Sequence, residues 1–440
     1  MSNDADDPIA AARDRSPLLR SYAEQYAGST PFAALTVGVS APLTPHTGLF
    51  IHVLAAGGAE VVATGEAGST HGEVVAWLRE QPGVTPLADA GMSHDDLVDA
   101  RRELLEREPD LLADDGAHVL SLVHEEFPDV AAGVRGACEQ TTGGITRLRT
   151  MDDQDALAFP VYDVNGTPMK QHFDNVHGTA ESSLSAITSL TDAMLAGSVA
   201  VVAGYGHCGR GIARKLRALG ARTVVTEVDP RKALSALADG HDVAPMGEAV
   251  QDATFVIAAT GRYHVLRREH LDALPDGVVL ASIGSAIEID TGALADEATQ
   301  IEERSPGVER YRLPGGRAVT LLTRGQVVNL SAPDSDGNPG EVMDTTFAMM
   351  ARGLAALADG VDLPPGLHPV PDRLDREVAH EKLAAMGVDI DEVSDERRAY
   401  HQQWEAHAGA GAGANDGSDD EPSDWLPPRA QARGFLLIPP

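Results

Sequence analysis

The stretch that decides the fold is Val199-Ala200-Val201-Val202-Ala203-Gly204-Tyr205-Gly206-His207-Cys208-Gly209. It opens with a short run of valine and alanine, a composition typical of a parallel strand that is buried on both faces. Three glycines follow in the spacing Gly-x-Gly-x-x-Gly, and residues 210–219 then have the pattern of a helix. The sequence therefore predicts a strand, a tight glycine-rich turn and a helix in direct succession.

Each glycine of this turn has its own physical task. Gly204 permits the tight turn, Gly206 lets backbone N–H groups approach a pyrophosphate, and Gly209 lets helix and strand pack closely. The pyrophosphate then lies at the positive end of the helix. The next predicted strand, 222–226, ends at Glu227, where a carboxylate accepts hydrogen bonds from both ribose hydroxyls and repels a 2′-phosphate. These residues predict a Rossmann-type site for NAD rather than NADP.

The chain before this turn alternates between apolar strands and helices in the same way. The candidate elements are 35–39, 46–56, 60–62, 70–80, 93–107 (with Ser93 as N-cap) and 111–113. Asp114 and Asp115 follow the last of these strands, where a parallel sheet binds its ligands. The pattern predicts an α/β fold with doubly wound, mostly parallel sheets. We expect a bridging helix from Ser182 to Ala196 and a helix from about Glu341 to Leu357 that returns to the first block.

The acidic balance is the strongest signal in the composition. The chain has 34 basic and 67 acidic residues and a net charge of -33. A surface of this sign repels phosphate, so we expect no nucleic-acid partner. The acidic residues are spread over the whole chain, a pattern that suits high salt, where screening removes most of the self-repulsion. We therefore expect a halophilic source.

The remaining composition indicates a cytoplasmic protein. The two cysteines, Cys138 and Cys208, are too few for a disulfide scaffold. No apolar run reaches the length that spans a membrane, and Met1 to Pro8 is acidic rather than signal-like. We expect no metal site and no membrane partner.

Several further segments resemble one enzyme family. Besides 201–211 and 226–230, they are Met169-Lys170-Gln171-His172-Phe173-Asp174-Asn175-Val176-His177-Gly178-Thr179, Arg310-Tyr311-Arg312-Leu313, Val328-Asn329-Leu330 and Glu341-Val342-Met343-Asp344. The first of these contains the pattern Lys-x-x-Phe-Asp-Asn. Together the segments resemble the S-adenosylhomocysteine hydrolases (adenosylhomocysteinases) from about Pro31 to Trp404, strongly after Asp110 and weakly before it.

The resemblance implies two Rossmann-like domains, with the cofactor domain inserted in the sequence of a discontinuous substrate domain. We expect a first part of the substrate domain at 1–180, the NAD-binding domain at 181–335, and a return to the substrate domain with C-terminal helices at 336–405. Residues 406–440 are expected to form a flexible acidic and Gly-Ala-rich tail. The resemblance also implies one tightly bound NAD per subunit, a small nucleoside thioether as substrate, and a homo-oligomer, either a dimer or a tetramer.

In this family, bound NAD oxidises the ribose 3′-hydroxyl to a ketone, which acidifies the 4′-proton and lets homocysteine leave. Water then adds and the ketone is reduced again, so the reaction is redox-neutral. The resemblance implies that Lys170 is the base for the 3′-hydroxyl and that Asp174 and Asn175 position Lys170 and the ribose. It implies Asp115 as an acid/base group near the 4′ and 5′ carbons.

The resemblance also implies contacts with the cofactor and the substrate. Thr141, Thr142 and Asn175 would contact the cofactor, and Asn329 would bind its nicotinamide end. Gln140 would lie at the ribose of the substrate.

The chain departs from the family on the substrate side. Pro42, Ser285 and Asn338 stand where the family has histidines, and Gly72 and Gln140 stand where it has carboxylates. Loss of one acid/base group alone can cost about 10²–10⁴ in rate. His46 and His71 lie close in sequence to two of these positions, although a structural role is the commoner one for an isolated histidine.

Three hypotheses follow from the retained and lost groups. The first is a hydrolase of S-adenosylhomocysteine or a related nucleoside thioether with a diverged substrate site. The second is a catalytically impaired NAD- or nucleoside-binding homologue that acts as a regulatory or partner subunit. The third is an enzyme that oxidises a ribose-like hydroxyl and stops there.

Overall fold

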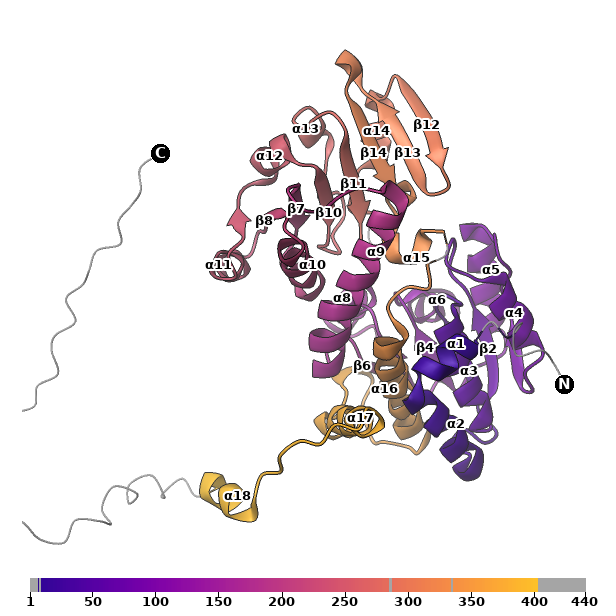
Figure 1. Ribbon diagram of the computed structural model, residues 1–440. Helices are drawn as coiled ribbons and strands as arrows, with labels where there is room; N and C mark the ends of the chain where they lie inside the picture. The colour runs from indigo at the N-terminus through magenta and orange to yellow at the C-terminus, as the bar shows by residue number, and fades with distance from the viewer. Residues whose placement is uncertain (1–6, 8, 285–286, 334, 403–440) are drawn as a thin grey trace, which may run out of the picture. The chain divides into compact units, whose positions relative to one another are not determined.

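The computed structural model describes residues 7, 9–284, 287–333 and 335–402. The chain divides into a compact unit that ends at Val388 and a second unit from Asp389, of which α18 (Asp395–Gln402) is the described helix. The first unit is built on two sheets, and many of its strands and helices are labelled in Figure 1.

The first sheet has seven strands, all paired in parallel, in the order β15-β6-β5-β4-β1-β2-β3. They are β1 (Thr36–Ser40), β2 (Glu60–Thr64), β3 (Val84–Pro86), β4 (Leu111–Asp114), β5 (Gly136–Glu139), β6 (Pro160–Asp163) and β15 (Gly366–Pro369). The helices that accompany them are α1 (Ala10–Arg15), α2 (Pro17–Ser29), α3 (Pro45–Ala56), α4 (Gly72–Arg79), α5 (His94–Leu105), α6 (His118–Glu126), α7 (Pro128–Ala131), α8 (Thr142–Asp152), α16 (Gly340–Ala358) and α17 (Asp372–Ala385). Because β15 lies so far along the chain from β6, the sequence of this sheet is interrupted by the second one.

The second sheet has eight strands in the order β12-β13-β14-β11-β10-β7-β8-β9. They are β7 (Val199–Ala203), β8 (Arg222–Thr226), β9 (Asp242–Val243), β10 (Phe255–Ala258), β11 (Val278–Ser282), β12 (Gln300–Ser305), β13 (Val308–Arg312) and β14 (Ala318–Leu322). Its pairs are parallel except for β12–β13 and β13–β14, which are antiparallel at one edge. The helices of this part are α9 (Thr179–Thr191), α10 (His207–Ala218), α11 (Pro230–Ala238), α12 (Met246–Ala249), α13 (Arg268–Leu271), α14 (Thr291–Glu297) and α15 (Val328–Ser331).

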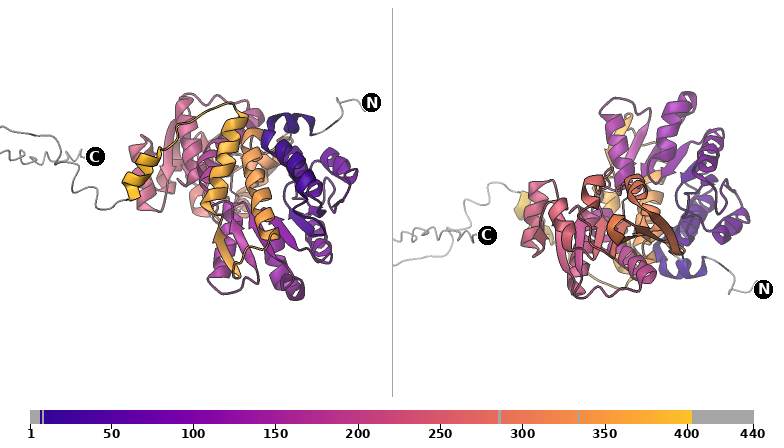
Figure 2. Two further views of the ribbon diagram at one scale, coloured as in Figure 1. Left: turned by 90° about the horizontal axis from the view of Figure 1, so that it is seen from below. Right: turned by 90° about the horizontal axis from the view of Figure 1, so that it is seen from above.

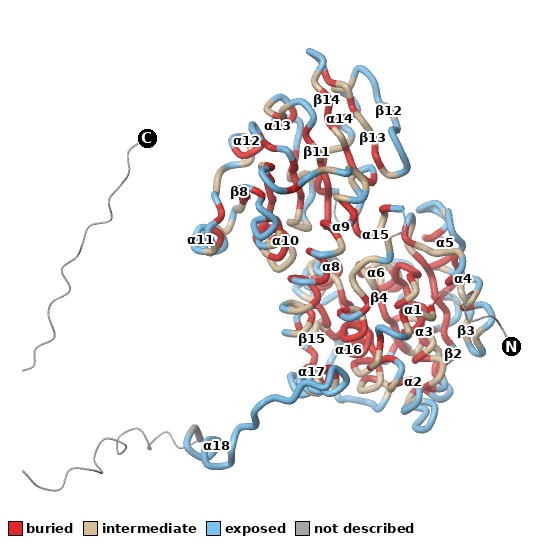
Figure 3. The backbone as a smooth tube through the Cα atoms, viewed as in Figure 1, coloured by how far each residue is buried: buried red, intermediate tan, exposed pale blue. Residues whose placement is uncertain are grey.

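The predicted α/β class with mostly parallel sheets is confirmed. The predicted strands 199–203 and 222–226 are β7 and β8, and the tube in Figure 3 shows the second sheet's central strands as buried. Valine and alanine fill β7 because both faces of a parallel strand are covered. Ser93 is the N-cap of α5, as predicted: its hydroxyl accepts a hydrogen bond from the Asp96 backbone N–H, and the Asp96 carboxylate accepts one from the Ser93 backbone N–H.

Helix α16 returns to the first sheet, as the sequence predicts. Phe347 on this helix stacks on Phe50 of α3, with ring centroids 4.9 Å apart. The views in Figure 2 show the orange and yellow C-terminal helices beside the indigo N-terminal ones, and α16 and α17 both contact α2. The N-terminal and C-terminal parts of the chain therefore share one core.

The predicted bridging helix is wrong in its bounds. It begins earlier, as a π-helix, η2 (Lys170–Gly178), which runs directly into α9, and it ends at Thr191 rather than Ala196. Asp192 has a left-handed backbone (φ 50°) that stops the helix before Gly197. Leu184 and Ile187 are buried as expected, but Met194 is 78% exposed because it lies beyond the helix end. In the described ranges, no helix is both long and apolar enough to cross a membrane.

Candidate active site

One cavity of about 1180 Å³ is lined by residues from both sheets. Most of its walls come from the carboxyl ends of parallel strands, where this class of fold binds ligands. The residues that follow directly on these strands are Asp115 after β4, Gln140 after β5, Gly204 after β7, Glu227 after β8, Ala259 after β10 and Ile283 after β11.

The glycine-rich turn has the geometry predicted from the sequence. Gly204 has φ 95°, and a side chain there would also lie 2.9 Å from the Ala259 carbonyl oxygen. A Cβ on Gly209 would lie 2.1 Å from the Gly204 carbonyl oxygen, so helix α10 can approach the turn only with glycine here. Around Gly206, by contrast, a Cβ would meet nothing within 4 Å. Open space at the second glycine, at the start of a helix, is what an approaching pyrophosphate requires.

Glu227 lines the same cavity beyond β8. Its carboxylate accepts hydrogen bonds from the backbone N–H groups of Tyr205 (2.7 Å), Val228 (2.7 Å) and Asp229 (3.0 Å). The carboxylate therefore bridges the glycine-rich turn and the end of β8. Sequence reasoning missed the basic groups that line the cavity from α11, from the loop after β10 and from the start of α13, none of which carries a motif: Lys232, Arg262, His264, Arg267 and His270.

The π-helix η2 presents Lys170 and Asp174 as a buried pair. Lys170 Nζ lies 2.5 Å from Asp174 Oδ2. Asp174 is fully buried and also accepts hydrogen bonds from Thr346 Oγ1 and Asn338 Nδ2, each at 2.5 Å. Lys170 lines the cavity while Asp174 lies behind it, so the hydrogen bond to Asp174 holds Lys170 Nζ at the cavity wall.

Asn165, which sequence reasoning missed, forms hydrogen bonds with both Asn175 and Thr142. The Asn165 side-chain oxygen accepts hydrogen bonds from Asn175 Nδ2 (3.0 Å) and Thr142 Oγ1 (3.3 Å). Asn165 lies just beyond β6, so its place after a parallel strand was the signal that could have found it. Thr141 caps α8, where its hydroxyl accepts a hydrogen bond from the Gly144 backbone N–H.

Asp115 and Gln140 face each other in the cavity. Gln140 Nε2 donates a hydrogen bond of 2.6 Å to Asp115 Oδ2. Burial raises the pKa of Asp115, while the hydrogen bond from Gln140 and the charge of Lys170 oppose that rise. The side-chain oxygen of Gln140 is buried and has no hydrogen-bond partner among the described residues.

Glu139 anchors the loops that carry these side chains. Its carboxylate is fully buried and accepts hydrogen bonds from the backbone N–H groups of Gly116, Ala117 and Thr141. Burial, together with the nearby Asp114 and Asp115, raises the pKa of Glu139 well above its usual range. It therefore holds the ends of β4 and β5 in register below the cavity floor.

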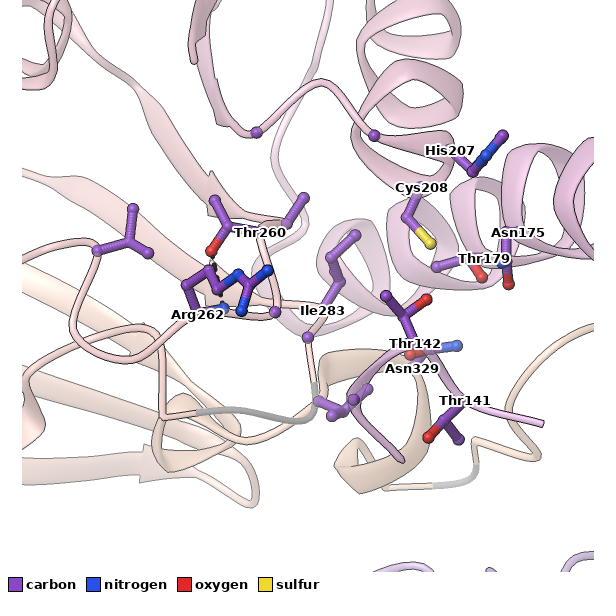
Figure 4. Close-up of a pocket in the computed structure, with 18 of the residues that line it drawn as sticks. Thr141, Thr142, Asn175, Thr179, His207, Cys208, Thr260, Arg262, Ile283 and Asn329 are labelled. Atoms are coloured by element: carbon purple, nitrogen blue, oxygen red, sulfur yellow. Dashed lines mark hydrogen bonds between the residues drawn. The ribbon is translucent and has the colours of Figure 1, made fainter. Parts of the chain in front are cut away.

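Asn329 lines the cavity from α15. Its amide Nδ2 donates to Ser182 Oγ and Asn338 Oδ1, both at 3.0 Å. Its Oδ1 is buried and has no hydrogen-bond partner among the described residues, although Asn329 lines the cavity. Figure 4 shows Asn329 beside Thr141 and Thr142, with Asn175 and Thr179 nearby.

The positions that lack the family's histidines and carboxylates lie in different parts of the structure. Pro42 and Asn338 line the cavity, Gly72 is the first residue of α4 away from it, and Ser285 lies outside the described residues. His46 is buried with both ring nitrogens unpaired among the described residues, and burial lowers its pKa. Neither His46 nor His71 belongs to the cavity lining. The nearby histidines therefore do not replace the lost ones.

The cavity, the turn and the Lys170 pair can now be compared with known proteins. A family model described as S-adenosyl-L-homocysteine hydrolase, NAD binding domain, matches residues 175–335. The chain is 41% identical, over 91% of its length and 94% of the relative's, to the S-inosyl-L-homocysteine hydrolase of Methanopyrus kandleri. The chain belongs to the S-adenosylhomocysteine hydrolase family. It is also 39% identical to the adenosylhomocysteinase of Halobacterium salinarum (92% and 98% covered) and 38% identical to that of Aquifex aeolicus (88% and 93%).

The residues present fit the NAD that this domain of the S-adenosylhomocysteine hydrolase family binds. The open space at Gly206 suits a pyrophosphate, and the unpaired, buried Oδ1 of Asn329 suits a ligand that donates a hydrogen bond, such as a carboxamide. NAD is therefore the cofactor of this chain.

Proposed function

We propose that this chain is an NAD-dependent hydrolase of S-adenosylhomocysteine or a related nucleoside thioether. The observation that carries the proposal is that a single cavity is lined by the glycine-rich turn, by Lys170, which is paired with Asp174 behind it, and by the Asp115–Gln140 pair. Cofactor and acid/base groups therefore face one ligand space.

Bound NAD supplies a hydride acceptor and donor for the ribose 3′-carbon. Lys170 removes and returns the proton of the 3′-hydroxyl, because its Nζ lies at the cavity wall. Asp174 holds Lys170 in place through its hydrogen bond, and Asn175, which Asn165 orients, positions the ribose. A base fixed in this way does not have to be ordered during the reaction, which is the advantage of preorganisation.

Asp115 handles protons at the 4′ and 5′ carbons in this proposal. Its raised pKa brings it closer to the operating pH, where a carboxyl group can both accept and donate a proton. Gln140 orients it through the 2.6 Å hydrogen bond. The unpaired Oδ1 of Asn329 and the unpaired side-chain oxygen of Gln140 are acceptors available to the nicotinamide and to a ribose hydroxyl, respectively.

The regulatory hypothesis is not favoured by this arrangement. Although the family's histidines are absent, Lys170 and Asp115 line one cavity and Asp174 is paired with Lys170. The relatives that match about nine-tenths of the chain are named as hydrolases. We keep two further points as proposals: a cofactor domain at 181–335 inserted in a substrate domain, and assembly as a homo-dimer or tetramer. Light scattering of the intact chain would test the second.

The test is thiol release from S-adenosylhomocysteine and from S-inosylhomocysteine in high-salt buffer, with NAD and an enzyme that removes the released nucleoside. We expect release by the parent, and a loss of at least about 100-fold in K170M, the scale of removing one acid/base group. K170M should still bind NAD. The matched control is K215M, because Lys215 lies on α10 in an ion pair with Glu181, away from the cavity. No thiol release from either substrate by NAD-loaded parent would contradict the proposal.

A further inference from the structure

Asn338 uses all of its hydrogen-bonding capacity inside the site. Its Nδ2 donates to Asp174 Oδ1 (2.5 Å) and to Thr179 Oγ1 (3.3 Å). Its Oδ1 accepts from Ser182 Oγ and from Asn329 Nδ2, both at 3.0 Å. We call these contacts the Asn338 network: Asn338 with Asp174, Thr179, Ser182 and Asn329.

The chemistry of the partners fixes which way the amide points. Ionised Asp174 can only accept hydrogen bonds, so the NH2 group must face it. The carbonyl oxygen then faces the NH2 group of Asn329, whose second hydrogen is donated to Ser182 Oγ. This leaves Asn329 Oδ1 turned to the cavity without a partner among the described residues. A side chain with both a donor and an acceptor is required here, and an amide provides both at every pH.

We propose that Asn338 is a positioning residue that joins the cofactor-side amide of Asn329 to the Lys170–Asp174 pair. It holds Asp174 from the side opposite Lys170, and it holds Asn329 so that the free Oδ1 faces the cofactor. The histidine expected here from the family is therefore not simply lost: an amide that does not titrate carries the connection. The kinetic part of this inference rests on the proposed function, whereas the cofactor-binding part does not.

The titratable groups around the network come from four elements. Lys170 and Asp174 lie on η2, and Cys208 on α10 lies near Thr179 with a pKa that burial raises to about 11. Asp336 on the same loop as Asn338 lies 3.7 Å from His71 Nδ1, in front of α4. Asp174 is the charged group that Asn338 contacts directly. A new negative charge at position 338 would therefore interact most strongly with Asp174.

The experiment uses N338D, which keeps the acceptor toward Asn329 and removes the donor toward Asp174. The introduced carboxylate faces a buried carboxylate, so its pKa rises, and when protonated it donates to Asp174 again. We expect kcat for thiol release to fall about 100-fold at pH 9, the scale of a misplaced catalytic group. Relative to the parent, kcat should recover at least tenfold by pH 6, with the nucleoside KM and the affinity for NAD within about threefold of the parent's. A merely structural role would lower activity equally at all pH values.

A second variant, N338A, removes both sides of the network. It should lower kcat at every pH and weaken NAD binding about fivefold, the scale of one net hydrogen bond. The control D359N changes a charge at the exposed end of α16, away from the network and the cavity, and should keep the parent's pH profile. The inference would be overturned if N338D kept the parent's kcat at pH 9. It would also be overturned if N338D lost kcat equally at every pH while keeping the parent's melting temperature. If the parent releases no thiol, NAD binding still decides: N338A must bind more weakly than N338D, and equal binding would overturn the inference.

Discussion

Gln140 places a neutral amide against a carboxylate that is already hard to ionise. Its NH2 group stabilises charged Asp115, which burial destabilises. Q140E would remove that donor and add a second negative charge at hydrogen-bond distance. Both changes disfavour ionised Asp115, so its pKa should rise further. We expect the limb of the pH–kcat/KM profile that Asp115 governs to move up by at least about one pH unit, equivalent to about 1.4 kcal/mol.

The matched control for this prediction is Q154E, because Gln154 is exposed just beyond α8. It adds the same charge to the molecule without facing Asp115. A Q140E profile that coincides with that of Q154E would mean that Asp115 does not titrate in the reaction.

Single residues show where sequence reasoning reached its limit. Lys170, Asp115 and Glu227 could be placed at the site because each lies in a motif or at a strand end. The role of Asn338 could not, because two of its partners, Asp174 and Ser182, lie 164 and 156 residues away in the sequence. Thr346 on α16 likewise reaches Asp174 only through the fold. Hydrogen bonds between elements depend on tertiary packing, which a local pattern does not contain.

Among the elements, the turn between β7 and α10 allows a matched pair of substitutions. Gly206 has φ −76°, and a Cβ there would meet nothing within 4 Å, so G206A should fold normally. The methyl group would nevertheless occupy the approach of the pyrophosphate, so we expect NAD affinity to fall at least tenfold. G209A places a Cβ 2.1 Å from the Gly204 carbonyl oxygen, and we expect a lower melting temperature even without NAD.

Titration with NAD and thermal unfolding of the two variants would check this contrast. A G206A variant with parental NAD affinity would show that the cofactor does not approach that backbone. A G209A variant with parental melting temperature would show that α10 can move away from the turn.

The π-helix η2 is one element that the sequence did not reveal. Its residues are recognised from the sequence only as a family motif, and the predicted bridging helix begins only at Ser182. The close approach of α10 offers a physical reason for the difference, because a Cβ on Gly211 would lie 2.0 Å from the Val176 carbonyl oxygen. The backbone of η2 is therefore packed directly against α10, and Lys170 of η2 lines the cavity. Periodicity reports which residues are apolar and does not report such a contact.

For the whole molecule, the alternation of strands and helices was enough to predict the α/β class, because buried parallel strands have a distinctive apolar composition. The antiparallel edge strands β12 and β13 were not predicted: their residues are partly exposed and charged, as in Glu302, Glu303 and Arg304. These edge strands form because they pair with neighbouring strands, which a local pattern does not show. Strand β7 is buried, and its apolar composition reveals it.

The net charge of -33 leads to a prediction about the stability of the entire chain. The 67 acidic residues outnumber the 34 basic ones by 33, so repulsion among the excess carboxylates opposes the compact state. Salt also weakens the surface ion pairs, but each of these contributes only about 0–1 kcal/mol. Screening of the excess charge should therefore dominate, since the Debye length falls from about 10 Å at 0.1 M to about 3 Å at 1 M. We expect the melting temperature to rise steadily from 0.1 to about 2 M KCl. Sucrose at matched osmolarity serves as a control that changes hydration without screening charge. If the melting temperature were the same in low and high salt, or rose equally in sucrose, charge repulsion would not be what destabilises the chain in low salt.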